Sequence, residues 1–576
     1  MTYLFEKVKD LRDYKYILFP IKRTIRVKLI YLIIASLYLC VFFLYKERYG
    51  VEANEIIRLL AVIVLFFMSP GYLLSKYFCS IDSNSIVTKT LYCTMVGLPV
   101  TILIFFLSNY YESGFVFYFY VLSSLVYSII CLVGDLGNRK GRYIRNESKN
   151  ESILILLLIV VILLVNINKS FISESPVDID GDKVYSSFIP HDYLNEISIA
   201  QLLIKDFDVQ YSYYLGGFSS TYGYYSQSPV GFTLVPFIAK YANLHPVMVW
   251  SLIAPIFFQI LFAFCTYLIL YQVLRDRYIA LLGFLMTPLA LPVEYLLGFR
   301  ENFLGIAESL DRHTVYLAYY MYAQRYFFAA LCLLIFFYFL NRYASEKKIG
   351  AVFLIGLVLD TLFFVRESVF LGAYLSVSIA ICIHLLIKRE KKQMQALLLI
   401  FVLFLPIFAH YHYKEPILEP IGKEISAAKI GFEIGFSTEY AKETIRSHDK
   451  TIVGTYAEPF ESFLDRVPDG FRYIRDFSYT VLYDIARGYG ILFVFLLVFT
   501  FYIFKLNVAY TYLGVFMVLM TFFENALFVR TENTVDVNRM IAFSLNNIDF
   551  MHSIAVLISF ILTGKCYLYV KRAVIK

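Results

Sequence analysis

The sequence predicts an all-α protein that crosses a membrane about fourteen times. Of its 576 residues, 59% are hydrophobic and 17% are charged, and the mean hydropathy is +0.65. Apolar runs of about twenty residues recur along the chain, and a helix of that length matches the hydrocarbon core of a bilayer. Basic loops follow every second run, as in the cytoplasmic loops of multi-pass proteins. The lipid bilayer is therefore the first predicted partner, and a soluble globular fold is excluded.

The N-terminal segment 1–28 carries eight basic residues against three acids, which predicts that it stays in the cytoplasm. It contains no short apolar core followed by small residues, so we predict no cleavable signal peptide. Four crossings then form an N-terminal membrane extension over residues 29–150, at 29–45, 57–75, 90–108 and 115–134. The loop that closes this extension is again basic, and we expect it in the cytoplasm.

A fifth crossing at 152–168 opens a membrane core over residues 151–409 and carries the chain to the outer side. Later crossings are expected at 246–271, 278–297, 318–340, 349–365, 369–387, 396–409, 489–505, 508–528 and 549–566. Because the number of expected crossings is even, we expect the C-terminus on the same side as the N-terminus, in the cytoplasm. Segment 230–242 is too short to span, so we expect a partly embedded or surface-lying helix there. Residues 410–488 are predicted to form a small outer subdomain or lid, ahead of C-terminal membrane helices in 489–576.

The outer loop at residues 169–228 is acidic and rich in tyrosine, whereas the predicted cytoplasmic loops are basic. Pro190 disfavours helix at the residue before it, and Asp192 then stands at the N-cap position of an amphipathic helix. The apolar positions of that helix are Leu194, Ile197, Ile199, Leu202, Leu203 and Ile204. We expect the helix to lie on the membrane surface. Asp192 is then either a helix cap or, with its neighbour His191, part of an active site that faces outward.

A second acidic group, DIDGD at Asp178–Asp182, places carboxylates at alternate positions. Such a group can hold a hard divalent cation, although its glycine is misplaced for a helix–loop–helix calcium site. Asp180 and Asp182 therefore stand as alternative bases or as metal ligands, and both alternatives stay open.

Arg366 and Glu367 stand between the crossings 349–365 and 369–387, at a turn that the topology puts on the outer side. This pair either caps a helical hairpin or supplies an arginine that holds a lipid phosphate at membrane depth. Arg325, near the outer end of its span, presents the same choice. Further candidates for a substrate-binding role are Arg312 and His313, and Arg530 and Arg539 in the last expected outer loop. The charges of that last loop, which also include Glu532 and Asp536, are explained equally well as ordinary solvated charges.

Two stretches carry a resemblance to a known family, IPHDYLNEISIAQLLIKDFDVQYSYYLGG at 189–217 and MSPGYLLSKYF at 68–78. With the order of spans and outer loop, they resemble the integral-membrane GT-C glycosyltransferases of a prokaryotic type with extra N-terminal helices. The resemblance covers residues 150–410. It implies transfer of a sugar, with inversion, from a polyprenyl-phosphate donor to a glycan, lipid or protein acceptor outside the cytoplasmic membrane. It maps the base onto Asp192, while the topology suggests Arg366 and Arg325 for the donor phosphate.

Other function classes fit parts of the pattern. An envelope oligosaccharide polymerase or ligase also combines many spans, outer-loop arginines and a lipid-linked substrate. A transporter would place its charges near mid-membrane, whereas most charges here stand near outer ends. A non-catalytic membrane scaffold gives no reason for an acidic insert. The net charge of +7 comes mainly from predicted cytoplasmic loops, so we expect no nucleic-acid partner.

Overall fold

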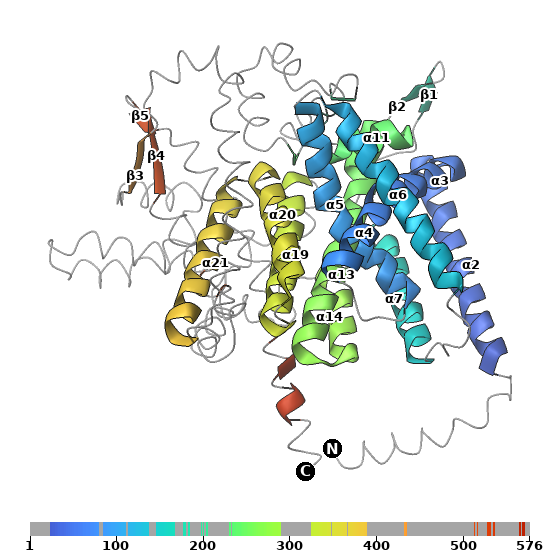
Figure 1. The fold of residues 1–576 in the computed structure, drawn as a ribbon. Coiled ribbons are helices and arrows are strands. Elements are labelled where there is room, and N and C mark those ends of the chain that lie inside the picture. The colour runs from blue at the N-terminus through green and yellow to red at the C-terminus, as the bar shows by residue number, and fades with distance from the viewer. Residues whose placement is uncertain are drawn as a thin grey trace, which may run out of the picture.

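The computed structural model describes residues 23–79, 85–110, 113–137, 146–166, 233–289, 324–346, 348–365 and 367–388, with shorter stretches within 177–231 and 431–570. The described chain forms a bundle of long helices (Figure 1). A two-stranded hairpin and a three-stranded sheet lie toward the upper end of the bundle in that view. The predicted all-α membrane fold is thus confirmed in its main part, with small β elements added to it.

The N-terminal half of the bundle consists of five helical rods that run up and down in turn (Figure 1). They are α2 (Arg23–Tyr49), the continuous rod α3 (Ala53–Val62), η2 (Ile63–Met68) and α4 (Ser69–Phe78), then α5 (Ile86–Tyr110), α6 (Gly114–Gly137) and α7 (Asn146–Asn166). Their positions match the expected crossings of the N-terminal extension and the fifth crossing.

The second rod widens into a π-helical turn, η2, immediately before Pro70. Proline has no N–H, so Pro70 cannot donate the usual helical hydrogen bond to the carbonyl of Phe66. The hydroxyl of Thr101 on α5 donates to that carbonyl instead, at 2.7 Å. A neighbouring helix therefore satisfies the backbone group that the proline releases, as a membrane interior requires.

The middle of the chain begins with a hairpin and continues into the centre of the bundle. Its elements are β1 (Val177–Ile179), β2 (Asp182–Val184), α11 (Leu234–Ala242), α12 (Pro246–Met248), η3 (Val249–Ile253), α13 (Ala254–Leu274) and α14 (Arg277–Leu289). The strands β1 and β2 pair antiparallel, with Ile179 opposite Asp182. The two residues between the strands are Asp180 and Gly181, a sequence that favours a tight hairpin turn.

Segment 230–242 does contain the expected short helix, α11, and most of its side chains are buried against the bundle. The fully buried ring of Phe237 packs against Phe66, Phe105 and Phe117, with centroid distances of 5.3, 4.9 and 6.0 Å. The helix ends at Asn243, whose φ of 49° is the left-handed conformation common at helix ends. Aromatic packing against three other helical segments thus holds α11 in place.

The C-terminal part of the described chain adds three helices and a small sheet. These elements are α19 (Gln324–Glu346), α20 (Ile349–Val365), α21 (Glu367–Lys388), β3 (Gly431–Ile434), β4 (Leu527–Thr531) and β5 (Thr534–Val535). The sheet is antiparallel in the order β3-β4-β5, with Gly431 opposite Arg530. The strand β3 belongs to the expected outer subdomain, and β5 belongs to the last expected outer loop. Since both strands pair with β4, these two parts of the chain meet in one sheet.

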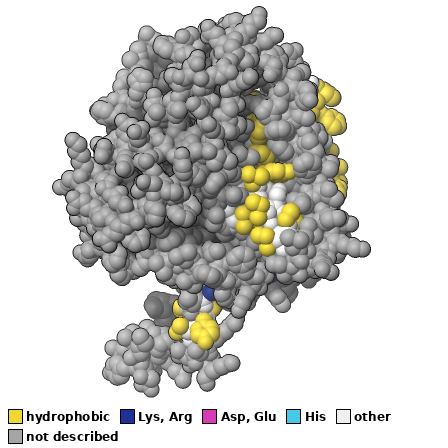
Figure 2. Space-filling view, turned by 90° about the vertical axis from the view of Figure 1, so that its left-hand side faces the viewer, with side chains coloured by type: hydrophobic (Ala, Val, Ile, Leu, Met, Phe, Trp, Pro, Cys, Tyr) yellow, Lys and Arg dark blue, Asp and Glu magenta, His cyan; other side chains and the backbone are white. Residues whose placement is uncertain are grey.

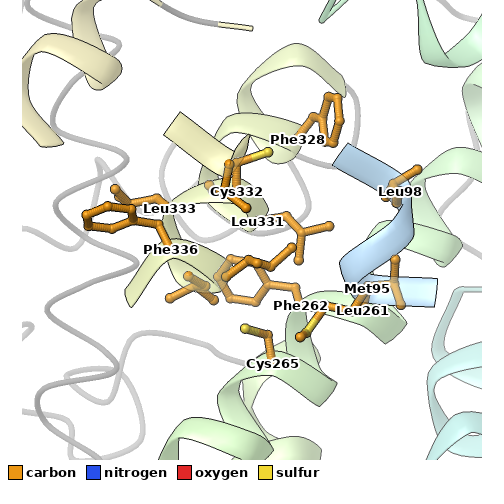
Figure 3. Packing of buried hydrophobic residues seen from close by; sticks show 14 of the residues in the cluster. Met95, Leu98, Leu261, Phe262, Cys265, Phe328, Leu331, Cys332, Leu333 and Phe336 are labelled. Atoms are coloured by element: carbon orange, nitrogen blue, oxygen red, sulfur yellow. The ribbon is translucent and has the colours of Figure 1, made fainter. Parts of the chain in front are cut away.

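The apolar core lies where α13 passes between α5 and α19. Figure 3 shows Met95 and Leu98 of α5 on one side of Leu261 and Phe262, and side chains of α19 on another. The ring of Phe262 stacks on Phe327 of α19 at a centroid distance of 5.4 Å. These side chains are almost fully buried, and α13 is therefore the central helix of the bundle.

The outer helices carry apolar side chains that face away from the bundle. On α6, Phe115 is 79% exposed and Ile130 is 63% exposed, and α2 exposes Leu32 and Phe43 in the same way. Most of the described side chains visible in Figure 2 are also hydrophobic. Exposed apolar surface of this extent is unfavourable in water and suits contact with lipid.

Six helices of the described chain are long and apolar enough to cross a membrane: Ile30–Tyr49, Ala53–Phe78, Ile86–Asn109, Gly114–Cys131, Pro246–Leu274 and Phe327–Glu346. Shorter apolar helices occupy Glu151–Leu164, Ile349–Val365 and Gly372–Ile383. The first ten expected crossings each coincide with a described helix, and the last four lie mostly outside the described residues. The protein is a multi-pass membrane protein.

Candidate functional site

The acidic insert ends at a point that the structure fixes against the bundle. The backbone N–H of Val230 donates to the carbonyl oxygen of Phe364 at 3.2 Å. Phe364 lies in the last turn of α20, and Val230 is fully buried. The residue two positions after Phe364 is Arg366. The C-terminal end of the insert is therefore a direct neighbour of the junction between α20 and α21.

The helix α7 ends at a second fixed point, shortly before the insert begins. Asn166, the last residue of α7, donates from Nδ2 to Oε1 of Gln259 on α13 at 2.7 Å. Gln259 donates back from Nε2 to Oδ1 of Asn166 at 3.2 Å. Both side chains are buried, and the amide of Asn166 also bonds the carbonyl of Ile162 at 2.8 Å. The chain is thus fixed before the insert by the contact of α7 with α13, and after the insert by the contact with α20.

The helical segment expected after Asp192 is present in the part that the structure describes. Ile197, Ala200 and Leu203 are helical and buried, and they belong to the main hydrophobic core. Their spacing of three residues puts them on one helix face. The amphipathic pattern therefore predicted the helical segment, whereas its buried residues pack on the protein itself rather than only on the membrane surface where we expected the helix.

The acidic DIDGD stretch contributes to the hairpin of β1 and β2. Asp178 pairs with Lys183 and Ile179 with Asp182 in the backbone register. This register places the backbones of Asp178 and Asp182 in two paired strands of a hairpin. Within the described residues, no group of three or more His, Cys, Asp or Glu side chains is arranged to hold a metal ion.

The predicted site residues fall into two groups. Those that lie outside the described residues are Asp192, His191, Asp180, Arg366, Arg312, His313 and Arg539. Those whose backbone alone is described are Asp182 in β2, Arg325 in α19, Glu367 in α21 and Arg530 in β4. The register of the small sheet brings the backbone of Arg530 opposite Gly431 and Val535.

Two buried acids were not predicted from the sequence. Glu151 on α7 accepts hydrogen bonds at Oε1 from Thr88 of α5 at 2.7 Å and from Tyr267 of α13 at 3.1 Å. Asp360 on α20 is only 2% exposed, and its Oδ1 has no hydrogen-bond partner. The signal for Asp360 was present in the sequence, because it is a lone acid inside the apolar run 349–365.

Comparison of the chain with protein-family models, with curated proteins and with solved structures finds no match. Within the described residues, the contact between Val230 and Phe364 joins two segments that carry predicted site residues.

Proposed function

We propose that this protein is a membrane glycosyltransferase that uses a polyprenyl-phosphate-linked sugar. The reaction would take place on the outer face of the cytoplasmic membrane, with both termini in the cytoplasm. The observation that carries the proposal is the hydrogen bond between Val230 and Phe364. This bond makes the end of the acidic insert adjacent to the helix end that precedes Arg366. Sugar transfer needs a carboxylate base and a cation close together.

The chemistry assigns one role to each of these segments. The hydroxyl oxygen of a glycan, lipid or protein acceptor attacks the anomeric carbon of the donor sugar, and the bond to the phosphate oxygen breaks. Asp192, beside His191, takes the proton of the acceptor hydroxyl on the face opposite the leaving group. Arg366 and Arg325 stabilise the negative charge on the departing polyprenyl phosphate. The product has inverted configuration at the anomeric carbon.

The lipid-facing surface of the bundle suits such a donor. A polyprenyl chain is apolar and stays in the hydrocarbon core of the membrane while its phosphate stands at the interface. The protein exposes apolar side chains along α2 and α6, which are in contact with that core when the helices span it. A divalent cation at Asp180 and Asp182 would be an additional phosphate ligand, and omission of metal from the assay tests that alternative.

The proposal is tested by transfer assays on Asp192→Asn. Membranes that contain the full chain and native acceptors are supplied with a panel of labelled polyprenyl-phosphate sugars, and release of polyprenyl phosphate is measured. A positioned base contributes a factor of about 100 to 10,000 to the rate, so Asp192→Asn should reduce transfer by that amount. The matched control is Asp206→Asn, which removes another acid of the same insert and should leave transfer unchanged.

Three results would change the proposal, and the last two would contradict it. Wild-type transfer by Asp192→Asn, with loss of transfer in Asp180→Asn or Asp182→Asn, would move the base to the hairpin. Wild-type activity in all three variants, with loss only on substitution of the outer arginines, would instead favour an envelope oligosaccharide polymerase or ligase. Binding of a labelled solute without any transfer would favour a transporter.

A further inference from the structure

Asp360 is an acid in the interior of the helical bundle. It lies in the apolar helix α20, five residues before the helix ends, and its side chain is 2% exposed. Its Oδ1 is buried and has no hydrogen-bond donor. The sugar-transfer mechanism proposed above gives this residue no role. An acid in such a place needs either a counter-charge, a metal ion or a proton.

No basic side chain of the described residues donates a hydrogen bond to Oδ1 of Asp360. The helices that pack against α20 are α4, α5, α19 and α21. Their acidic and basic residues are Lys76, Lys89, Arg325, Arg342, Glu346, Glu367, His384 and Lys388. Lys348, which precedes α20, is twelve residues away, which corresponds to about 18 Å along the helix axis.

The described side chains around Asp360 form no metal-binding group. Hard cations such as Mg²⁺ and Ca²⁺ need about six to eight oxygen ligands. The nearest polar neighbour in sequence, Thr361, donates its hydroxyl to the carbonyls of Leu357 at 2.8 Å and Pro99 at 3.3 Å. No cluster of three or more His, Cys, Asp or Glu side chains occurs in the described residues. The ligand that remains is a proton.

We propose that Asp360 is a proton-binding site inside the membrane domain and that the folded protein holds it as the neutral acid. An ionised carboxylate without partners in a protein interior is unfavourable by several kcal/mol, whereas a neutral carboxylic acid avoids most of this penalty. Release of the proton requires Asp360 to reach water, so proton binding favours the packed position of α20. Through the bond from Val230 to Phe364, the same helix holds the end of the acidic insert.

Infrared spectroscopy of the full-length protein in lipid nanodiscs at pH 7 tests the proposal, because a protonated acid and a carboxylate absorb at separate positions. The spectrum of Asp360→Asn is subtracted from that of the wild type. We expect loss of a protonated-acid band. The control is Glu346→Gln, since Glu346 pairs with Arg342 at 2.7 Å and with Lys348 at 2.9 Å. This control should lose carboxylate bands only.

Loss of carboxylate bands, rather than the protonated-acid band, in Asp360→Asn would overturn the proposal. A second measurement avoids any dependence on the folding of the variant. Wild-type protein is prepared with ¹³C in the side-chain carboxyl of aspartate, which should shift the protonated-acid band. A wild-type spectrum without a shifted protonated-acid band would show that every aspartate is ionised and would contradict the inference.

Discussion

Asn166 and Gln259 hold each other through two hydrogen bonds between their side-chain amides, one in each direction. The pair joins the last residue of α7 to the second turn of α13, the central helix of the bundle. Because both residues are buried among apolar side chains, neither amide can turn to water without separating the helices. The pair thus fixes the place from which the chain continues toward the acidic insert.

The first prediction concerns the contribution of this pair to the free energy of unfolding. Gln259→Met removes one partner and leaves the buried amide of Asn166 with lost hydrogen bonds, which should destabilise the protein by about 1–3 kcal/mol. Asn166→Leu should act similarly. The double variant removes both amides and should recover much of the loss, since no unpaired polar group remains. Apparent unfolding temperatures in detergent, measured for all four proteins, give the comparison. Additive losses would show that the two amides are not coupled.

The second prediction concerns the crossing of α4 and α5 at Gly71 and Gly97. A Cβ added at Gly71 would overlap the carbonyl oxygen of Cys93 and lie 2.8 Å from the backbone nitrogen of Gly97. Backbone atoms of a packed helix cannot move aside as a side chain does, so Gly71→Ala should destabilise the protein by about 1–3 kcal/mol or more. The control is Gly114→Ala, where an added Cβ meets nothing within 4 Å. Equal unfolding temperatures for the two variants would contradict the close crossing.

The spans were predictable from the sequence, while the contacts between them were not. An apolar run of about twenty residues predicts a membrane helix almost by itself, because lipid leaves no other way to satisfy the backbone. Hydropathy does not say which helices touch. The burial of α11 depends on the rings of Phe66, Phe105 and Phe117, which come from distant parts of the chain. The short apolar segment before Pro246 therefore predicted the helix α11, but it did not predict which aromatic rings would bury that helix.

The third prediction concerns Glu151, which joins α7 to α5 and α13. Glu151→Leu leaves the hydroxyl groups of Thr88 and Tyr267 without their acceptor, and each unsatisfied buried donor is unfavourable by about 1–3 kcal/mol. Glu151→Gln retains an oxygen at the same position, so its loss of stability should be clearly smaller. Unfolding temperatures of the two variants test this order. An equal loss for Gln and Leu would mean that the charge of Glu151, rather than its acceptor oxygen, stabilises the bundle.

The fourth prediction concerns orientation in the membrane. Cysteines placed at Ser220 and Ser462 should react with an impermeant thiol reagent in intact cells, because we expect both positions on the outer side. A cysteine at Ser148 should react only after the membrane is opened. The protein without added cysteine gives the background from native cysteines such as Cys40. Reaction of Ser148→Cys alone in intact cells would reverse the orientation and move the insert to the cytoplasm.

The candidate site was predictable to a lesser degree than the fold. Charge and pattern in the insert predicted the helical segment with Ile197 and Leu203, and the described part of that segment confirms it. The contact of Val230 with Phe364 could not be predicted, since it depends on a backbone bond between residues more than a hundred positions apart. The roles of Asp192 and Arg366 stay predictions. Local pattern specifies local structure, whereas a site assembled from several spans depends on packing that no single stretch encodes.

The last prediction separates the two roles that the sequence allows for Arg366. If Arg366 only caps a helical hairpin with Glu367, an exposed ion pair contributes about 0–1 kcal/mol and Arg366→Gln should transfer sugar normally. If it binds the donor phosphate, loss of a charge-assisted contact should weaken use of the lipid donor by roughly 1.5–3 kcal/mol, about ten- to a hundredfold. The measurement is transfer rate against donor concentration, with Lys240→Gln on α11 as the matched loss of a cation.

Arg366→Lys refines the same experiment. Lysine keeps the positive charge but lacks the planar pair of N–H donors that fits a phosphate, so we expect only partial recovery of donor use. A purely electrostatic role would make the lysine variant equal to the wild type. Identical curves for the wild type and Arg366→Gln would remove phosphate binding from the turn between α20 and α21, and Arg325 would then be the arginine to test. The proposed base at Asp192 would be unaffected by that result, since its own variant measures a separate step.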